Sequence, residues 1–186
     1  MVSIPSLWLP ILLSAVFVFF LSWIIHMLLP YHRTDFGKLP SETEVQEALR
    51  KFDLPPGDYI LPHPGSPAGM RSPEFLDKRN KGPVAVMTVM KSGSFDMGKN
   101  LIQWFVYCVI VSVFAAYIAG RALPAGAPYL KVFRFVGATA FIGYAMGLWQ
   151  NSIWYSRAWS TTLKSTLDGL LYGLFTAGTF GWLWPR

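Results

Sequence analysis

Four long hydrophobic runs, separated by polar segments, organise the chain. They cover residues 8–29, about 100–120, about 132–154 and about 162–184. At about 1.5 Å per helical residue, the first run reaches roughly 33 Å, enough to cross a bilayer core of about 30 Å. The pattern predicts an all-α membrane protein with four transmembrane helices. The first (residues 1–30) is separated from a three-helix bundle (residues 99–186) by a small extramembrane α/β segment (residues 31–98).

A cleaved signal peptide is the alternative interpretation of the first run. The run has no basic residues before it and is longer than the apolar core of a signal peptide. It also lacks a small-x-small cleavage site before Pro30. These features favour a helix that stays in the membrane.

The polar segment alternates helical and strand patterns. Ser41 and Glu44 are spaced as in a capping box, and apolar residues follow at helical spacing. Residues 58–61 and 84–90 read as short strands, and Ser72-Pro73 predicts the start of a second helix. A unit this short buries little core alone, so we expect it to pack against the bundle or a partner.

Small residues follow one face of the last hydrophobic run at every fourth position. They are Ser165, Gly169, Gly173, Ala177 and Gly181. The third run has a similar stripe that includes Gly143 and Gly147. Small residues let helices approach closely in lipid, where packing drives association. A short connection makes these two helices antiparallel neighbours, so we expect the two stripes to face each other and to serve packing.

The charges gather outside the hydrophobic runs. The net charge is +6, and residues 1–30 contain no Lys, Arg, Asp or Glu. Residues 31–99 have a net charge of +1 and residues 100–186 of +5. Because the basic excess flanks hydrophobic runs, it indicates membrane topology rather than nucleic-acid binding. The single cysteine, Cys108, excludes an intramolecular disulfide and a multi-cysteine metal site.

The distribution of basic residues also bears on orientation. Near the span ends, eight Lys and Arg lie on the side of the polar segment and four on the side of the termini. This ratio predicts that the segment of a multi-pass membrane protein between its first two spans is cytoplasmic. If only the short loops and the C-terminal tail are counted, two Lys and Arg lie on the side of the polar segment and four on the side of the termini, which is the opposite bias. We therefore expect residues 31–98 in the cytoplasm and leave the opposite orientation open.

Asp168 is the one acid outside residues 31–99, and it falls inside the fourth predicted span. An ionisable residue in a span is by default a functional candidate. The alternative is that Asp168 lies at the level of the lipid headgroups and pairs with Lys164 or Arg157. Such a position near the start of a helix also suits an acid, because the helix dipole is positive there.

Two histidines lie close to the same membrane face as Asp168. His26 is near the end of the first span, and His32 and Asp35 follow it. With Asp168 they form a candidate metal or proton site, to which His63 is a further candidate ligand. Their spacing matches no standard ligand motif, so the identity of any metal is unknown. Interfacial histidines bonded to backbone or headgroups are the alternative.

Motifs for catalysis are missing from the sequence. It contains no nucleophile–base–acid set, no phosphate-binding glycine loop and no dinucleotide fingerprint. We therefore expect no enzyme and predict no cofactor, with a bound lipid or pigment left open.

Two stretches carry a resemblance to a known family. They are His26-Met-Leu-Leu-Pro-Tyr-His32-Arg-Thr-Asp35-Phe-Gly-Lys-Leu-Pro40 and Thr176-Ala-Gly-Thr-Phe-Gly-Trp-Leu-Trp-Pro185. The chain resembles a family of small four-span bacterial inner-membrane proteins with no assigned activity. The resemblance implies a bacterial inner-membrane protein and no catalytic residues.

Three hypotheses of function follow from the sequence. The first is an accessory subunit of a larger membrane complex, for example a respiratory or photosynthetic one, with membrane lipids and other subunits as partners and no nucleic acid. The second is a small transporter or a metal- or proton-handling protein that uses His26, His32 and Asp168. The third is a membrane enzyme with its site in residues 31–98, which a deep pocket lined by Asp35, Asp58 and His63 would support.

Overall fold

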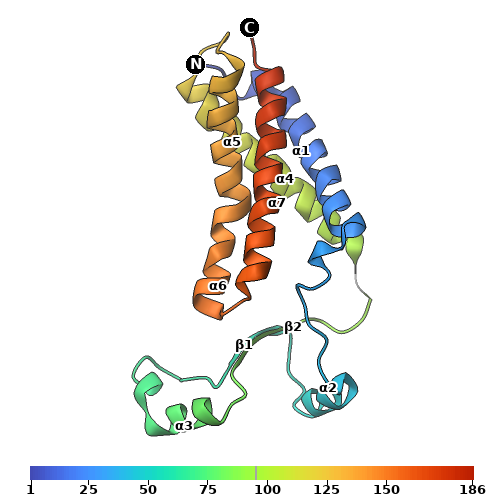
Figure 1. Cartoon of the computed structure of the whole chain (residues 1–186), viewed down its shortest axis with the longest axis vertical. Coiled ribbons are helices and arrows are strands. Elements are labelled where there is room, and N and C mark those ends of the chain that lie inside the picture. Colours follow the sequence, from blue (N-terminus) through green and yellow to red (C-terminus); the bar gives the residue numbers. More distant parts are fainter. Residues whose placement is uncertain (95) are drawn as a thin grey trace. The chain divides into compact units, whose positions relative to one another are not determined.

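The computed structural model describes residues 1–94 and 96–186 and is mostly helical (Figure 1). The chain forms two compact units. One joins Met1–Phe36 to Asp96–Arg186, and the other is Gly37–Phe95. They are called the helical unit and the polar unit below.

Three helices of the helical unit are long and apolar enough to cross a membrane. They are Pro5–Leu28, which contains α1 (Trp8–Trp23); α4 (Met97–Ala122); and Tyr129–Tyr155, which joins α5 (Tyr129–Ala145) to α6 (Trp149–Tyr155). The prediction of a mostly helical protein is thus confirmed, and three of the four predicted spans are candidate membrane-spanning helices. The fourth predicted run forms α7 (Trp159–Trp182), which is less apolar because it includes Lys164, Asp168 and several Thr and Gly residues.

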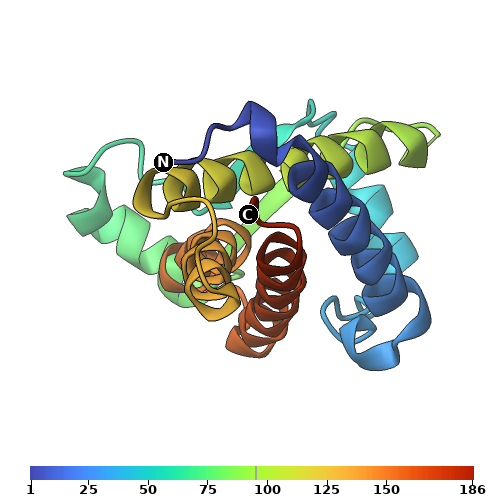
Figure 2. The same cartoon turned by 90° about the horizontal axis from the view of Figure 1, so that it is seen from above.

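The four long helices pack as a ring. α7 lies beside α5 on one side and α1 on the other, and α4 contacts both α1 and α5 (Figure 2). All four contribute to the buried core, for example through Leu7, Ala119, Val136 and Phe180. The sharp turn at Ser156, which has a φ of 55°, lets α7 run back along α6 and α5.

Both chain termini lie at the same end of the helical unit (Figure 1). The Val2 amide donates to the Gly120 carbonyl at 2.8 Å, and the Gly126 amide donates to the Pro185 carbonyl at 2.8 Å. The indole of Trp184 also donates to the Pro124 carbonyl at 2.9 Å. These bonds tie the two termini to the α4–α5 connection.

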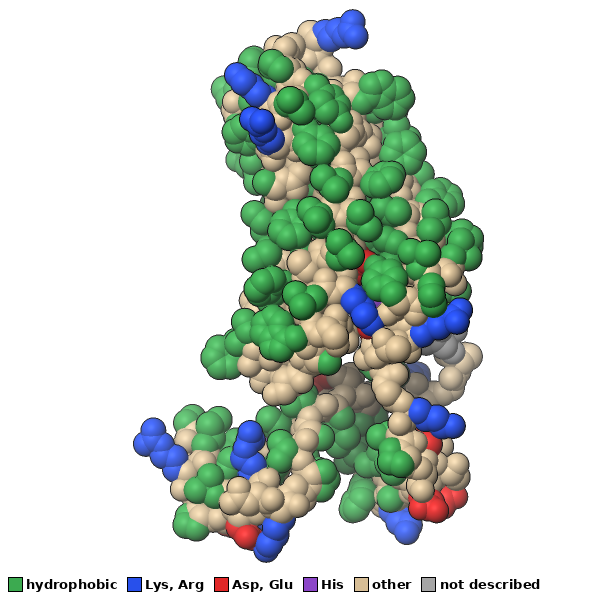
Figure 3. Space-filling view, viewed as in Figure 1, with side chains coloured by type: hydrophobic (Ala, Val, Ile, Leu, Met, Phe, Trp, Pro, Cys, Tyr) green, Lys and Arg blue, Asp and Glu red, His purple; other side chains and the backbone are tan. Residues whose placement is uncertain are grey.

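Hydrophobic side chains dominate the outside of the helical unit on the face shown in Figure 3, whereas its Lys and Arg side chains gather toward the ends. Large exposed examples include Trp8, Phe20, Phe114, Ile142 and Phe175. In water such a surface would be unfavourable, but it suits contact with lipid tails.

The polar unit has the predicted order of helix, strand, helix and strand. Its elements are α2 (Glu42–Arg50), β1 (Gly57–Leu61), α3 (Pro73–Lys81) and β2 (Ala85–Val89). The strands pair antiparallel, with Tyr59 opposite Met87. Ser72 caps α3 by accepting a hydrogen bond from the Phe75 amide at 3.2 Å.

The predicted capping box at Ser41 is wrong, although the helix after it forms. Ser41 adopts a left-handed conformation with φ of 48°, and its side chain makes no cap hydrogen bond. A capping residue normally has an extended backbone, so this conformation turns the hydroxyl away from the first turn of α2. Pro62 is the one buried residue between positions 37 and 94, so the polar unit has almost no core of its own.

Candidate functional site

The end of the first membrane-spanning helix turns back and brings two histidines together. α1 widens into a π turn, η2 (Ile24–Leu28), and Pro30 then opens the short turn η3 (Pro30–His32). The rings of His26 and His32 meet edge to face, with centroids 4.5 Å apart. π turns inserted in helices are frequent at functional sites.

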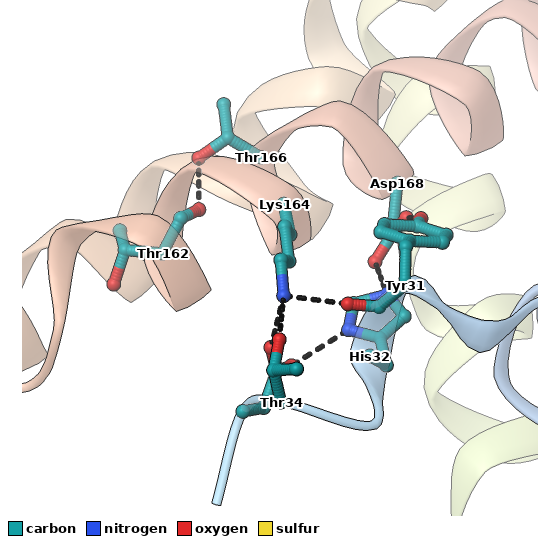
Figure 4. Close-up of polar contacts among 8 residues, drawn as sticks. Tyr31, His32, Thr34, Thr162, Lys164, Thr166 and Asp168 are labelled. Carbon is teal, nitrogen blue, oxygen red and sulfur yellow. Dashed lines mark hydrogen bonds and ion pairs between the residues drawn. The ribbon is translucent and has the colours of Figure 1, made fainter.

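Helix α7 supplies the opposite wall of this site. Lys164 and Asp168 are four residues apart, so they lie on one face of α7 and both point toward the turn after α1 (Figure 4). The Asp168 side chain is 4% exposed and that of Lys164 is 24% exposed. A carboxylate this deeply buried needs partners to offset the loss of hydration.

The imidazole of His32 lies between two carboxylates. Its Nδ1 is hydrogen-bonded to Oδ2 of Asp35 at 2.7 Å, and its Nε2 lies 2.9 Å from Oδ2 of Asp168. The second contact is short but does not meet hydrogen-bond geometry, so Nε2 is buried without a hydrogen-bond partner. The Tyr31 hydroxyl donates to the other oxygen of Asp168, Oδ1.

Lys164 holds the turn that carries His32 (Figure 4). Its Nζ donates to the Tyr31 carbonyl at 2.5 Å, to Oγ1 of Thr34 at 2.9 Å and to Oδ1 of Asp35 at 2.9 Å. The alternative in which Lys164 pairs with Asp168 is therefore wrong. The turn after α1 brings Asp35 to the ammonium group, and Asp168 instead faces Tyr31 and His32.

The surroundings shift the pKa values of two groups outside the spans. Burial alone would raise the pKa of Asp35, but hydrogen bonds from His32 and Lys164 outweigh it and lower that pKa below its usual value. Burial, together with the hydrogen bond to Asp168, raises the pKa of the Tyr31 hydroxyl. Tyr31 therefore stays a proton donor, and Asp35 stays an acceptor.

Three potential metal ligands converge in the site. One ligand atom from each of His26, His32 and Asp168 lies within 4.8 Å of the others. Asp35, the fourth predicted member, is hydrogen-bonded to the far side of His32. Two imidazoles and a carboxylate are donors that divalent transition metals accept, and the same groups can pass a proton.

His63 lies in the polar unit, where it is exposed and its Nδ1 accepts a hydrogen bond from the Gly65 amide at 3.0 Å. It is outside the group of three converging ligands. Asp58, named with it in the enzyme hypothesis, accepts a hydrogen bond from Thr88 at 2.6 Å across the two strands.

The small residues of α7 lie against α5. A Cβ on Gly169 would be 2.7 Å from the Cβ of Ala145, and one on Gly173 would be 3.2 Å from the Phe141 amide nitrogen. Further along, Ala177 meets Gly137, and a Cβ on Gly181 would be 2.6 Å from the Tyr129 ring. Ser165, the first residue of the stripe, is half-buried.

The expected partner stripe on the third span is wrong. Gly143 faces Val111 of α4, where an added Cβ would be 3.2 Å from a Val111 methyl group. Gly147 has no neighbouring atom within 4 Å of such a Cβ. The surface of α5 that meets α7 is instead rotated to Gly137, Phe141 and Ala145.

Tyr31 and the pairing of Lys164 with Asp35 were missed by the sequence reasoning. A signal was present, since Tyr31 precedes His32 and Lys164 lies one helical turn before Asp168. Their contacts depend on how the turn after α1 folds onto α7, which residue spacing does not specify.

Comparisons with protein-family models, curated proteins and solved structures found no match to this chain. The resemblance to small bacterial inner-membrane proteins remains a prediction.

Proposed function

We propose that this chain is a four-span membrane protein that takes up and releases a cation, a proton or a metal ion, at His26, His32 and Asp168. The observation that carries the proposal is the short distance, 2.9 Å, between a buried imidazole nitrogen without a hydrogen-bond partner and a buried carboxylate oxygen. Buried groups of this kind are costly and are retained mainly where they serve a function.

The charge of the site supports a cation. The site contains two carboxylates, Asp35 and Asp168, but one ammonium group, that of Lys164, which contacts Asp35. One negative charge is left unbalanced while both imidazoles are neutral. A proton on His32, or a metal ion beside it, would balance that charge.

The site can be reached from outside the bundle. His26 is its exposed member and also lines a pocket of about 470 Å³ between α1 and α4. Trp23, Met27, Met97 and Trp104 form much of the wall of this pocket. A cation could therefore contact His26 first and Asp168 last.

Helix α7 completes the proposal as the fourth span. Its 24 residues correspond to about 36 Å, and it runs along the length of α5 from Ala145 to Tyr129. Its polar residues lie largely inside the bundle, for example Thr176 and Asp168. We place the protein in a bacterial inner membrane, with residues 31–98 in the cytoplasm.

Ion flux into liposomes tests the function. The purified protein is reconstituted with an internal pH-sensitive dye or an internal zinc-sensitive dye, and a proton or zinc gradient is applied. Wild-type protein should dissipate at least one gradient, and Asp168→Asn should not. Asp96→Asn is the matched control because it removes the same charge at the start of α4 and keeps an acceptor for the helix cap. Wild-type vesicles that behave like empty ones under both gradients would refute the function.

A second candidate, an accessory subunit of a larger membrane complex, is favoured by the polar unit. That unit leaves large apolar side chains exposed, among them Leu39, Phe52, Met70 and Met90. Another protein subunit is a natural cover for such a surface. Purification from native membranes in mild detergent should then bring down a stoichiometric partner that is lost when Phe52 and Met90 are changed to Ser. A protein that stays monomeric in every mild detergent would exclude this candidate.

A further inference from the structure

We infer that His26, His32 and Asp168 bind one divalent first-row transition-metal ion of the zinc type, and that Asp35 positions His32 for it. This inference rests on the proposed cation-handling function and specifies the class of cation. It follows from the directions of the four side chains, from their burial and from the chemistry of the donors.

His32 is oriented as a metal ligand. Asp35 accepts a hydrogen bond from Nδ1 at 2.7 Å, which places the proton of a neutral ring on Nδ1 and the lone pair on Nε2. A carboxylate that holds a histidine through its second nitrogen is the usual arrangement behind histidines that bind metals. Lys164 fixes Asp35 in turn through a contact of 2.9 Å.

Asp168 offers one free oxygen to the same point. Tyr31 donates to Oδ1, which leaves Oδ2 facing Nε2 of His32 at 2.9 Å. Two acceptors this close, with no hydrogen bond between them, are the arrangement expected of two ligands of one cation. Tetrahedral zinc with bonds of about 2.0–2.1 Å separates its ligands by roughly 3.3 Å, so a small outward movement would admit the ion.

His26 supplies the third ligand. Its ring lies edge to face with that of His32, and the three ligand atoms fall within 4.8 Å of one another. Imidazole suits zinc, iron, nickel and copper, whereas magnesium and calcium prefer oxygen ligands alone. Three protein ligands also leave a coordination position open, as in metal sites that exchange a water or a substrate.

A protonated His32 between its two carboxylates is the competing interpretation. It would balance the same charge, and it predicts a strong hydrogen bond from Nε2 to Asp168. The contact is short, but it does not meet hydrogen-bond geometry, and Nε2 has no hydrogen-bond partner. The geometry thus favours the metal ion.

Zinc binding to the full chain in detergent tests the inference. The protein is stripped with a chelator, the chelator is removed, and Zn²⁺ is titrated by calorimetry. One equivalent should bind. Co²⁺ in place of Zn²⁺ should give visible absorption bands of a four-coordinate site with nitrogen and oxygen ligands. Absence of stoichiometric zinc binding would overturn the inference.

Three variants assign the ligands. His26→Gln, His32→Gln and Asp168→Asn should each weaken zinc binding by more than about a hundredfold, since even residues behind the ligands contribute about 10- to 100-fold. His63→Gln is the matched control, because His63 is the third histidine and lies outside the converging group. Equal losses for His63→Gln and His26→Gln would overturn the assignment. If Asp168→Asn fails to fold, His26→Gln still decides, because His26 is exposed.

Asp35→Asn separates positioning from ligation. It should weaken zinc binding by about 10- to 100-fold while keeping the one-to-one stoichiometry and the cobalt band positions. A loss of the cobalt bands would make Asp35 a ligand and overturn its positioning role.

Two outcomes separate the metal site from the proposed function. Zinc binding without flux in liposomes would refute the transport function and leave the metal site standing. Proton flux that depends on Asp168, without zinc binding, would refute the metal site and leave the cation-handling function standing.

Discussion

Gly169 of α7 lies so close to Ala145 of α5 that a side chain has no room between them. A Cβ built on Gly169 would be 2.7 Å from the Cβ of Ala145 and 3.3 Å from its backbone. Asp168, the adjacent residue, is the deepest member of the candidate site. The close approach of α5 and α7 therefore also fixes the position of the Asp168 carboxylate.

Gly169→Ala should destabilise the helical unit by about 1–3 kcal/mol, because the methyl group overpacks the contact with Ala145. The higher helix propensity of alanine would offset up to about 1 kcal/mol of this loss in stability. Thermal unfolding in detergent measures the effect. Gly147→Ala is the matched control, since an added Cβ there meets no atom within 4 Å. Equal melting temperatures for the two variants would contradict the close packing.

Lys164→Gln should loosen the turn that carries His32. The substitution removes an ammonium group with three acceptors, Tyr31, Thr34 and Asp35. Because Lys164 is partly exposed, we expect a loss of about 1–2 kcal/mol, which corresponds to about 5- to 30-fold faster amide exchange in residues 29–36. Hydrogen-exchange mass spectrometry of that peptide measures it.

Lys131→Gln serves as the control for the loss of positive charge. Lys131 is exposed near the start of α5, and its side chain makes no hydrogen bond or ion pair with the residues that the structure describes. Exchange in residues 29–36 should match the wild type in this variant. A similar acceleration in both variants would show that the three Lys164 contacts do not hold the turn.

Asp35 gives the helical unit a stability that acid removes. Its pKa is lower in the folded protein than its ordinary value of 3.8, so the ionised form favours folding. The contribution is fully present above about pH 4 and is lost as the pH falls through the lowered pKa. The difference in melting temperature between wild type and Asp35→Asn should therefore shrink toward zero in strong acid.

Asp96→Asn controls for charge in that experiment, since it leaves an acceptor for the Lys99 amide. Comparing the two variants over the same pH range separates the loss of the Asp35 contacts from the loss of one negative charge. If the Asp35→Asn difference stays constant between neutral and acid pH, Asp35 does not contribute through its ionised form.

The sequence predicted where the helices lie and which residues could be ligands. It did not predict how each helix is rotated about its own axis. The stripe from Ser165 to Gly181 identified the packing face of α7, because a helix fixes which residues share a face. It could not identify the partner face of α5, since Gly143 and Gly137 lie on different faces of the same helix. Which face meets α7 depends on the packing of the whole ring, including Val111 of α4.

The candidate site shows the same limit. His26, His32 and Asp168 were predicted together because they fall near one membrane boundary, and the structure brings them within reach of one another. The pairing of Lys164 with Asp35 was not predicted. It depends on a π turn and a proline that reverse the chain, and hydrophobic periodicity carries no signal for the direction of such a turn.

The placement of α7 across the membrane can be tested by cysteine labelling. In a Cys108→Ala background, which removes the buried native cysteine, single cysteines are introduced at Ser3, Arg157 or Arg186. If α7 crosses the bilayer, Ser3→Cys and Arg186→Cys should react with an impermeant maleimide from one side, and Arg157→Cys from the other. The bond between Gly126 and Pro185 already holds the C-terminus at the end of the unit where the N-terminus lies. Labelling of positions 157 and 186 from the same side would show that α7 does not cross and that Asp168 meets water by another route.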